Sequence, residues 1–123
     1  MISLPNDNAK REEVESFLRS FREKKKTFEI TFIDRPKNKQ ALLDLELRAI
    51  DREKFIHQLK VEDFYRGPIP EDWYGSKEMW EFGKEIKGHE VYIKICLGPP
   101  NSNVICISFH IAEYKMTYPF KPT

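Results

Sequence analysis

Side chains of the types that move protons and hold phosphates are concentrated in the C-terminal third of the chain: Glu85, Tyr92, Lys94 and His110. A Pro/Gly-rich segment further upstream adds Arg66. Such a set suits metal-free phosphodiester chemistry, in which a base takes the proton of a ribose 2′-OH, cations stabilise the charged phosphorus and an acid protonates the leaving oxygen. His110 suits either proton-transfer role because histidine titrates near neutral pH. A merely solvated sheet face would carry the same residue types.

Three stretches that position these side chains have the two-residue period of half-buried strands. Residues 90–97 and 103–111 are rich in β-branched residues, and 98–102 between them have a pure turn composition. Residues 81–87 precede them and join through Gly88-His89, which suits a two-residue type II′ turn. We therefore predict a three-strand antiparallel meander.

Burial selects the register of this meander, because a one-residue slip would mix apolar with polar residues. The chosen register sets Ile93 opposite Phe109 and Ile95 opposite Ile107, and side chains opposite each other share a face. The predicted apolar face contains Val91, Ile93, Ile95, Leu97, Ile105, Ile107, Phe109 and Ile111.

The predicted polar face follows from the same register. Tyr92 lies opposite His110, and Lys94 lies opposite Ser108. The turn at Gly88-His89 sets Glu85 opposite Tyr92, and it puts Glu81 on this face while Phe82 and Ile86 go to the apolar one. Cys96 and Cys106 also fall opposite each other; a disulfide would fit there, but a reducing cytosol favours two free thiols.

The length indicates a single domain over residues 1–123. Charged residues make up 33%, hydrophobic ones 40%, and no apolar run approaches the roughly 20 residues that span a bilayer. The first six residues lack the pattern of a signal peptide, so we expect a cytoplasmic protein without a membrane partner. No Cys/His spacing resembles a metal site, and we expect no cofactor.

Helices are predicted in the N-terminal half. Residues 9–26 form an amphipathic helix with N-cap candidates at 6–8, a solvated basic end at 24–26 and an apolar stripe of Val14, Phe17, Leu18 and Phe21. A strand follows over 27–34, then a helix over 39–45 capped by Asn38, and another helix that is capped by Asp51 and buries Phe55, Ile56 and Leu59. The small antiparallel sheet would pack against these N-terminal helices.

Two segments are predicted to be irregular. Residues 61–75 read as a Pro/Gly-rich loop in which Phe64 and Trp73 cover the edge of the core, while Arg66 reaches toward a site. The tail, residues 113–123, is rich in aromatics and prolines and too apolar to be disordered. It either packs back on the domain or forms a strip that binds a partner.

Three motifs resemble those of MqsR-type toxins, which belong to the RelE-like toxins of bacterial type II toxin–antitoxin pairs. The segment 42–66 is similar to the one that leads into an Asp-Phe-Tyr-Lys motif, here Asp63-Phe64-Tyr65-Arg66. Residues 88–95 resemble the family's Gly-x-Val-Tyr-x-Lys strand with one residue added, and 104–110 resemble its last strand, which ends Ser-Phe-Lys. The likeness covers most of the chain in order.

The resemblance implies a small α+β fold of the RelE-like type and a metal-independent endoribonuclease (an mRNA interferase) that inhibits translation and growth. It also implies a neutralising antitoxin and an mRNA substrate, either free or on the ribosome. The family's catalytic Lys falls on Arg66, its strand Tyr on Tyr92 and its final Lys on His110. Its Gln after a Trp would fall on Glu81.

The expected catalytic residues are therefore His110 as acid or base, Arg66 to neutralise the phosphate, Tyr92 to orient it and Glu85 as a candidate base. Residues expected to contact RNA are Lys94, Glu81 and Tyr65. The alternative is a non-catalytic protein-binding module of the same fold, which the net charge of +1 and the apolar tail favour. An inactive relative of the toxins is a third reading.

Overall fold

The computed structural model describes residues 9–73 and 76–122. Within these ranges, it describes the backbone but not the side chains of residues 72–73 and 76–77. Its elements are α1 (Arg11–Lys25), β1 (Ile30–Phe32), α2 (Pro36–Asp44), α3 (Asp51–His57), a 3-10 turn η1 (Val61–Asp63), β2 (Phe64–Trp73), β3 (Ser76–Ile86), β4 (His89–Cys96) and β5 (Val104–Ile111). The protein is thus α+β, as predicted. No helix among these residues is both long and apolar enough to cross a membrane.

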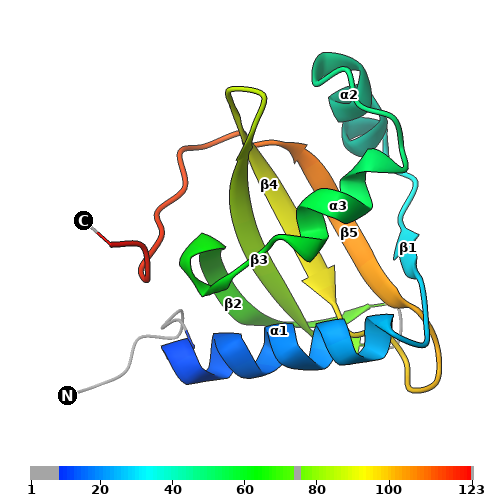
Figure 1. Ribbon diagram of the computed structural model, residues 1–123, viewed down its shortest axis with the longest axis vertical. Helices are drawn as coiled ribbons and strands as arrows, with labels where there is room; N and C mark the ends of the chain where they lie inside the picture. Colours follow the sequence, from blue (N-terminus) through cyan, green and yellow to red (C-terminus); the bar gives the residue numbers. More distant parts are fainter. Residues whose placement is uncertain (1–8, 74–75, 123) are drawn as a thin grey trace.

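One five-stranded mixed sheet forms the centre of the molecule, in the order β1-β5-β4-β3-β2. The predicted antiparallel meander is confirmed as β3-β4-β5, but the sheet is larger than predicted. β1 pairs in parallel with the outer edge of β5, and β2 pairs antiparallel with β3. Figure 1 shows α1 and α3 on one face of the sheet, with α2 beside β5.

The main core lies between the sheet and α1. The predicted stripe is buried, with Val14 fully inaccessible and Phe17, Leu18 and Phe21 at 5% exposure or less. The Phe17 ring stacks on Trp80 of β3 at a centroid distance of 4.6 Å. α1 begins where the Lys10 backbone N–H donates to Glu13 Oε1 at 3.0 Å, so the cap comes later than the predicted residues 6–8, which lie outside the described part.

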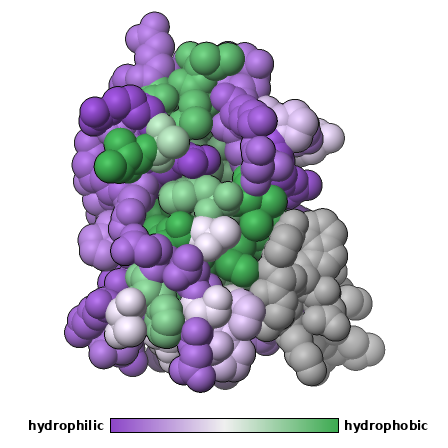
Figure 2. Space-filling view, turned by 90° about the vertical axis from the view of Figure 1, so that its right-hand side faces the viewer, coloured by the Kyte–Doolittle hydropathy of each residue, from purple (hydrophilic) through white to green (hydrophobic). Residues whose placement is uncertain are grey.

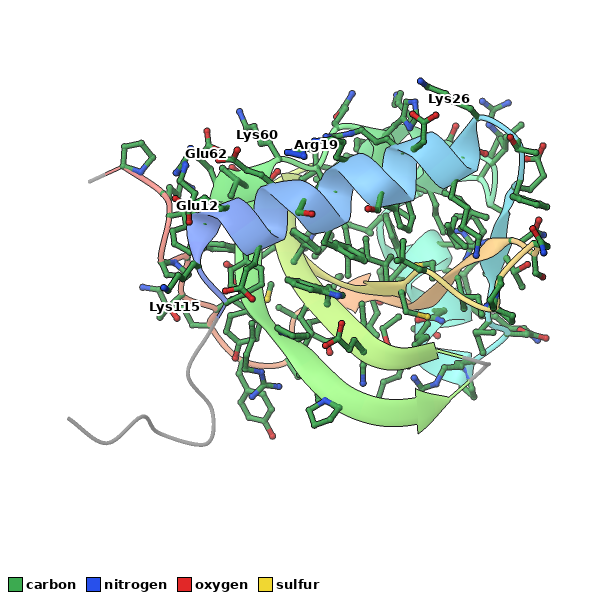
Figure 3. All side chains as sticks on the ribbon, turned by 90° about the horizontal axis from the view of Figure 1, so that it is seen from below. Glu12, Arg19, Lys26, Lys60, Glu62 and Lys115 are labelled. Atoms are coloured by element: carbon green, nitrogen blue, oxygen red, sulfur yellow. The ribbon has the colours of Figure 1, made fainter. Side chains whose placement is uncertain are left out.

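Of the three lysines predicted to form a solvated helix end, Lys24 and Lys25 bind the rest of the domain, whereas Lys26 is exposed as predicted. The Lys24 ammonium donates to the carbonyl oxygens of Leu97 and Pro99, the latter at 2.7 Å, where the chain leaves β4. Lys25 pairs with Glu53 of α3. Figure 3 looks onto the outer side of α1, where Glu12, Arg19 and Lys26 are exposed and Lys60 and Glu62 lie beyond the helix.

η1 and β2 occupy residues 61–73 of the segment predicted as a loop over 61–75, and residues 74–75 lie outside the described part of the chain. β2 is the edge strand of the sheet, where proline is tolerated, and its pairing with β3 is interrupted by register shifts between Phe64 and Arg66, Arg66 and Ile69, and Pro70 and Trp73. Gly67 has a φ of +136°, and a Cβ there would lie 3.0 Å from the Met79 carbonyl oxygen. Turn-forming residues therefore mark irregularities within a strand, not its absence.

The turn between β3 and β4 differs from the predicted one by two residues of register. Its central residues are Lys87 and Gly88, both with positive φ (51° and 83°), as a type I′ turn requires. Ile86 therefore pairs with His89, and Phe82 with Ile93. Since side chains alternate with period two, this slip leaves every residue on its predicted face. It changes only the opposite partners.

A β-bulge interrupts the predicted register of β4 and β5. Tyr92–His110, Ile93–Phe109 and Lys94–Ser108 pair as predicted, but Ile95 then pairs with Cys106. Ile107 is left without an opposite residue, so the alternation of β5 is reversed before it. Cys106 consequently belongs to the core of α1, while Ile105 and Ile107 join a second cluster with Cys96 and Met79.

Asn38 holds this bulge in place. It is buried inside α2, where it donates to the carbonyl oxygens of Ile33 and Ile107 (3.0 Å each) and accepts from the Phe109 backbone N–H (2.9 Å). The prediction that Asn38 caps the helix was wrong, because Pro36 begins the helix and Arg35 is its N-cap. The asparagine satisfies backbone groups that the bulge leaves unpaired.

The two cysteines are buried and form no disulfide. Because of the bulge, Cys96 lies opposite Ile105 rather than opposite Cys106. Burial raises the pKa of the Cys106 thiol to about 12, so it stays protonated at neutral pH.

Figure 2, which views the molecule from its β1 side, shows apolar residues at the level of α2 and again in the middle of that side, bordered by hydrophilic ones.

Candidate functional site

A pocket of about 220 Å³ opens on the sheet face opposite α1. The sheet contributes Tyr65, Arg66, Tyr92 and His110 to its lining. All four were predicted from sequence as site residues. β2 supplies the first two, and the neighbouring strands β4 and β5 supply the others.

The tail forms the other wall of this pocket, with Ala112, Glu113, Tyr114 and Met116. After β5 the chain turns back across the sheet, and Figure 1 shows it passing the β3–β4 hairpin toward the side where α1 begins. Of the two readings of the tail, packing against its own domain is the one observed. Its aromatic composition was the signal, but sequence did not indicate that it would border the site.

Two hydrogen bonds to Glu90 hold the tail on the sheet, and the absence of a side chain at Gly83 leaves room for it there. The Met116 backbone N–H donates to Glu90 Oε1 at 3.2 Å, and the Tyr118 hydroxyl donates to Oε2 at 2.7 Å. A Cβ at Gly83 would lie only 2.6 Å from Met116 Cε and would collide with the Tyr118 hydroxyl. A side chain at this position would therefore force Met116 and Tyr118 to shift.

Glu81 organises the floor of the site. Its side chain is 3% exposed; Oε1 accepts from Arg66 Nε at 2.6 Å and Oε2 accepts from the Tyr92 hydroxyl. Sequence predicted Glu81 as a residue that contacts RNA. The structure shows both carboxylate oxygens engaged, by Arg66 and Tyr92, and the side chain buried.

Arg66 is the cation that faces solvent at the pocket. Its side chain is 50% exposed, and its guanidinium carbon lies 5.2 Å from the centroid of the Tyr65 ring. The hydrogen bond to Glu81 raises the pKa of Arg66, so the guanidinium keeps its charge and cannot act as a base. Nε is the atom of the guanidinium that bonds Glu81.

Tyr92 and His110 lie side by side, with ring centroids 5.2 Å apart at an angle of 39°. Burial, and next the hydrogen bond to Glu81, raises the pKa of Tyr92 well above its usual value, so the phenol stays protonated. His110 Nδ1 lies 3.0 Å from the Ile111 carbonyl oxygen, which can only accept. In the neutral ring Nδ1 therefore carries the proton, and Nε2 has the free electron pair of a base.

Lys94 and Glu85 are not part of this pocket. Lys94 is on the predicted face, but its side chain is 13% exposed and its ammonium lies 2.7 Å from Glu71 Oε1 on β2. The prediction that Glu85 lies opposite Tyr92 was wrong: the two-residue slip sets Gly83 opposite Tyr92 and Glu85 opposite Glu90. Neither side chain therefore lines the pocket.

The described residues contain no group of three or more His, Cys, Asp or Glu side chains placed to hold a metal ion. A search against protein-family models, a search of curated proteins and a search of solved structures each find no match to this chain. A proposal for the function of this protein therefore rests on the residues that line the pocket.

Proposed function

We propose that this protein is an endoribonuclease that cleaves mRNA without a metal, as the toxin of a bacterial type II toxin–antitoxin pair does. The observation that carries the proposal is the convergence of His110, Tyr92 and Arg66 on one pocket. In the motifs that resemble those of MqsR-type toxins, these three positions correspond to that family's catalytic residues. The proposal includes a cytoplasmic location and a cognate antitoxin.

His110 is the general base in this mechanism. Its Nε2 takes the proton of a ribose 2′-OH, and the 2′ oxygen attacks the adjacent phosphorus. The bond from phosphorus to the 5′ oxygen breaks, and the leaving oxygen takes a proton from water. The products are a 2′,3′-cyclic phosphate and a 5′-hydroxyl end, so atoms and charge balance without a redox step.

Arg66 stabilises the charge that develops on the phosphate oxygens. A planar guanidinium suits this role because its donors match two phosphate oxygens at once. Its Nε is already held by Glu81, so the remaining donors are oriented before substrate binds. Tyr92 stays a neutral phenol beside His110 and orients the ribose and phosphate against the imidazole.

Induced expression in a bacterial host tests the proposal. The parent is expected to arrest growth, and His110→Ala is expected to relieve the arrest while the protein remains soluble and folded. His57→Ala is the matched control, because His57 is an exposed histidine near the end of α3 and outside the pocket. Normal growth with abundant folded parent protein would contradict the toxin proposal and favour the non-catalytic binding module.

A further inference from the structure

Tyr114 is a large aromatic residue that the fold leaves on the surface of the tail. It is 84% exposed, more than any other large hydrophobic residue among those described. It also lines the pocket that contains Arg66, Tyr92 and His110. Within the described part of the chain, no hydrogen bond or ring contact engages its side chain.

The backbone on both sides of Tyr114 is nevertheless fixed. Before it, the Ala112 N–H donates to the Glu90 carbonyl oxygen at 2.8 Å, and Glu113 Oε1 pairs with Lys37 of α2 at 2.7 Å. After it, Met116 is 5% exposed, and its N–H bonds the Glu90 carboxylate. A ring held between two anchors loses little further freedom when a ligand stacks on it.

The opposite wall of the pocket presents a second ring and a cation. Tyr65 and Arg66 come from β2, so aromatic surface and positive charge reach the pocket from an element unrelated to the tail. Aromatic rings beside a cation are the elements with which proteins hold single-stranded nucleic acid, because each base offers a flat face and each phosphate a charge.

We propose that the tail builds a nucleobase subsite, in which the Tyr114 ring stacks on the base of a nucleotide next to the phosphate that Arg66 holds. The inference rests on the proposed ribonuclease function for its substrate class, single-stranded RNA. Tyr114 is a binding and specificity residue here, and it takes no part in proton transfer.

Binding of an uncleavable RNA tests this subsite separately from catalysis. The probe is a short, labelled single-stranded RNA with 2′-O-methyl riboses, and the readout is its dissociation constant from fluorescence anisotropy. Tyr114→Ala is expected to weaken binding by roughly 5- to 150-fold, the range for loss of one stacked base. Tyr114→Phe keeps the ring and is expected to stay within about twofold of the parent.

The matched control is Leu43→Ala, which removes another exposed apolar side chain (73%) from α2, outside the pocket. A set of probes with one abasic position each then locates the stacked base. One abasic probe should bind the parent weakly, and its penalty should vanish in Tyr114→Ala. Equal dissociation constants for the parent, Tyr114→Ala and Leu43→Ala would overturn the inference.

The two proposals fail in different ways. If the parent binds the probe through Tyr114 but never cuts the unmodified RNA, the nuclease proposal is wrong and the base subsite stands. If the parent cuts RNA and Tyr114→Ala binds and cuts as well as the parent does, the subsite is wrong and the nuclease stands. Circular dichroism and the thermal midpoint of each variant establish that the fold is unchanged.

Discussion

Arg66 Nε lies 2.6 Å from Glu81 Oε1, yet the arginine side chain is half exposed and the glutamate is 3% exposed. The ion pair therefore links a buried carboxylate on the sheet to a guanidinium at the surface of the pocket. Because one partner is well solvated, the ion pair adds little to folding stability, on the order of 0–1 kcal/mol. We attribute its importance to the orientation of the guanidinium.

Arg66→Ala is expected to reduce kcat/KM for RNA cleavage by the equivalent of about 2–4 kcal/mol, because a preorganised donor to the transition state is lost. Arg66→Lys should recover only part of this loss, since an ammonium lacks the planar pair of donors. Steady-state cleavage kinetics measure both effects. Unchanged kinetics for Arg66→Ala would remove this residue from the site.

Glu81→Gln tests whether Glu81 positions Arg66 and Tyr92 without contacting the substrate itself. The amide keeps the size of the buried side chain but weakens both of its hydrogen bonds, so we expect a loss of about 1–3 kcal/mol in the free energy of unfolding. Cleavage should fall while affinity for uncleavable RNA changes little. A large loss of RNA affinity in this variant, with cleavage of bound RNA intact, would contradict the positioning role.

Tyr92 should make the protein less stable in alkali. Its pKa is raised in the folded state, so its contribution is complete below the unfolded-state pKa of about 10 and declines as pH rises above that value. For one such group, the free energy of unfolding falls by about 1.4 kcal/mol per pH unit in this range. Urea unfolding at several pH values above 10 should show a weaker decline in Tyr92→Phe. An identical decline of the free energy of unfolding in parent and variant would contradict the raised pKa of Tyr92.

Asn38→Ala should destabilise the protein by about 2–4 kcal/mol, because it leaves buried backbone groups at the β5 bulge without partners. Gln40→Ala is the matched control on the same helix. Gln40 is exposed and bonds Asp44 at 2.9 Å, so its loss should cost no more than about 0.5 kcal/mol. Chemical denaturation of both variants measures the difference, and equal costs would be inconsistent with the role given to Asn38.

Gly83→Ala should displace the tail, because the added Cβ collides with the Tyr118 hydroxyl and approaches Met116 Cε to 2.6 Å. We expect a loss of about 1–3 kcal/mol and faster proteolysis within residues 113–122. In a Tyr118→Ala background the same substitution should cost much less, since the collision partner is gone. Additive costs in the double variant would show that the tail does not rest on Gly83.

Much of the fold follows from local patterns in the sequence. Val14, Phe17, Leu18 and Phe21 are buried as their helical spacing predicts. Tyr92 pairs with His110 as the strand pattern predicts, because burial of one sheet face strongly constrains register. The same regularity is enough to place these two candidate site residues side by side.

The rest depends on tertiary contacts that local patterns do not encode. The bulge at Ile107 lies within an unbroken apolar run, and the asparagine that stabilises it comes from α2, far away in sequence. The turn at Lys87-Gly88 competes with one at Gly88-His89, and their two registers bury the same residues. The path of the tail depends on Gly83, whose missing side chain gives no hydrophobic signal.

Cleavage of a labelled single-stranded RNA by purified protein in EDTA tests the central claim most directly, with His110→Ala and His57→Ala compared under single-turnover conditions. We predict fragments that end in a 2′,3′-cyclic phosphate, a rate constant about 10²- to 10⁴-fold lower for His110→Ala, and no change for His57→Ala. Equal cleavage by the parent and folded His110→Ala, or no cleavage by the parent at all, would contradict the account.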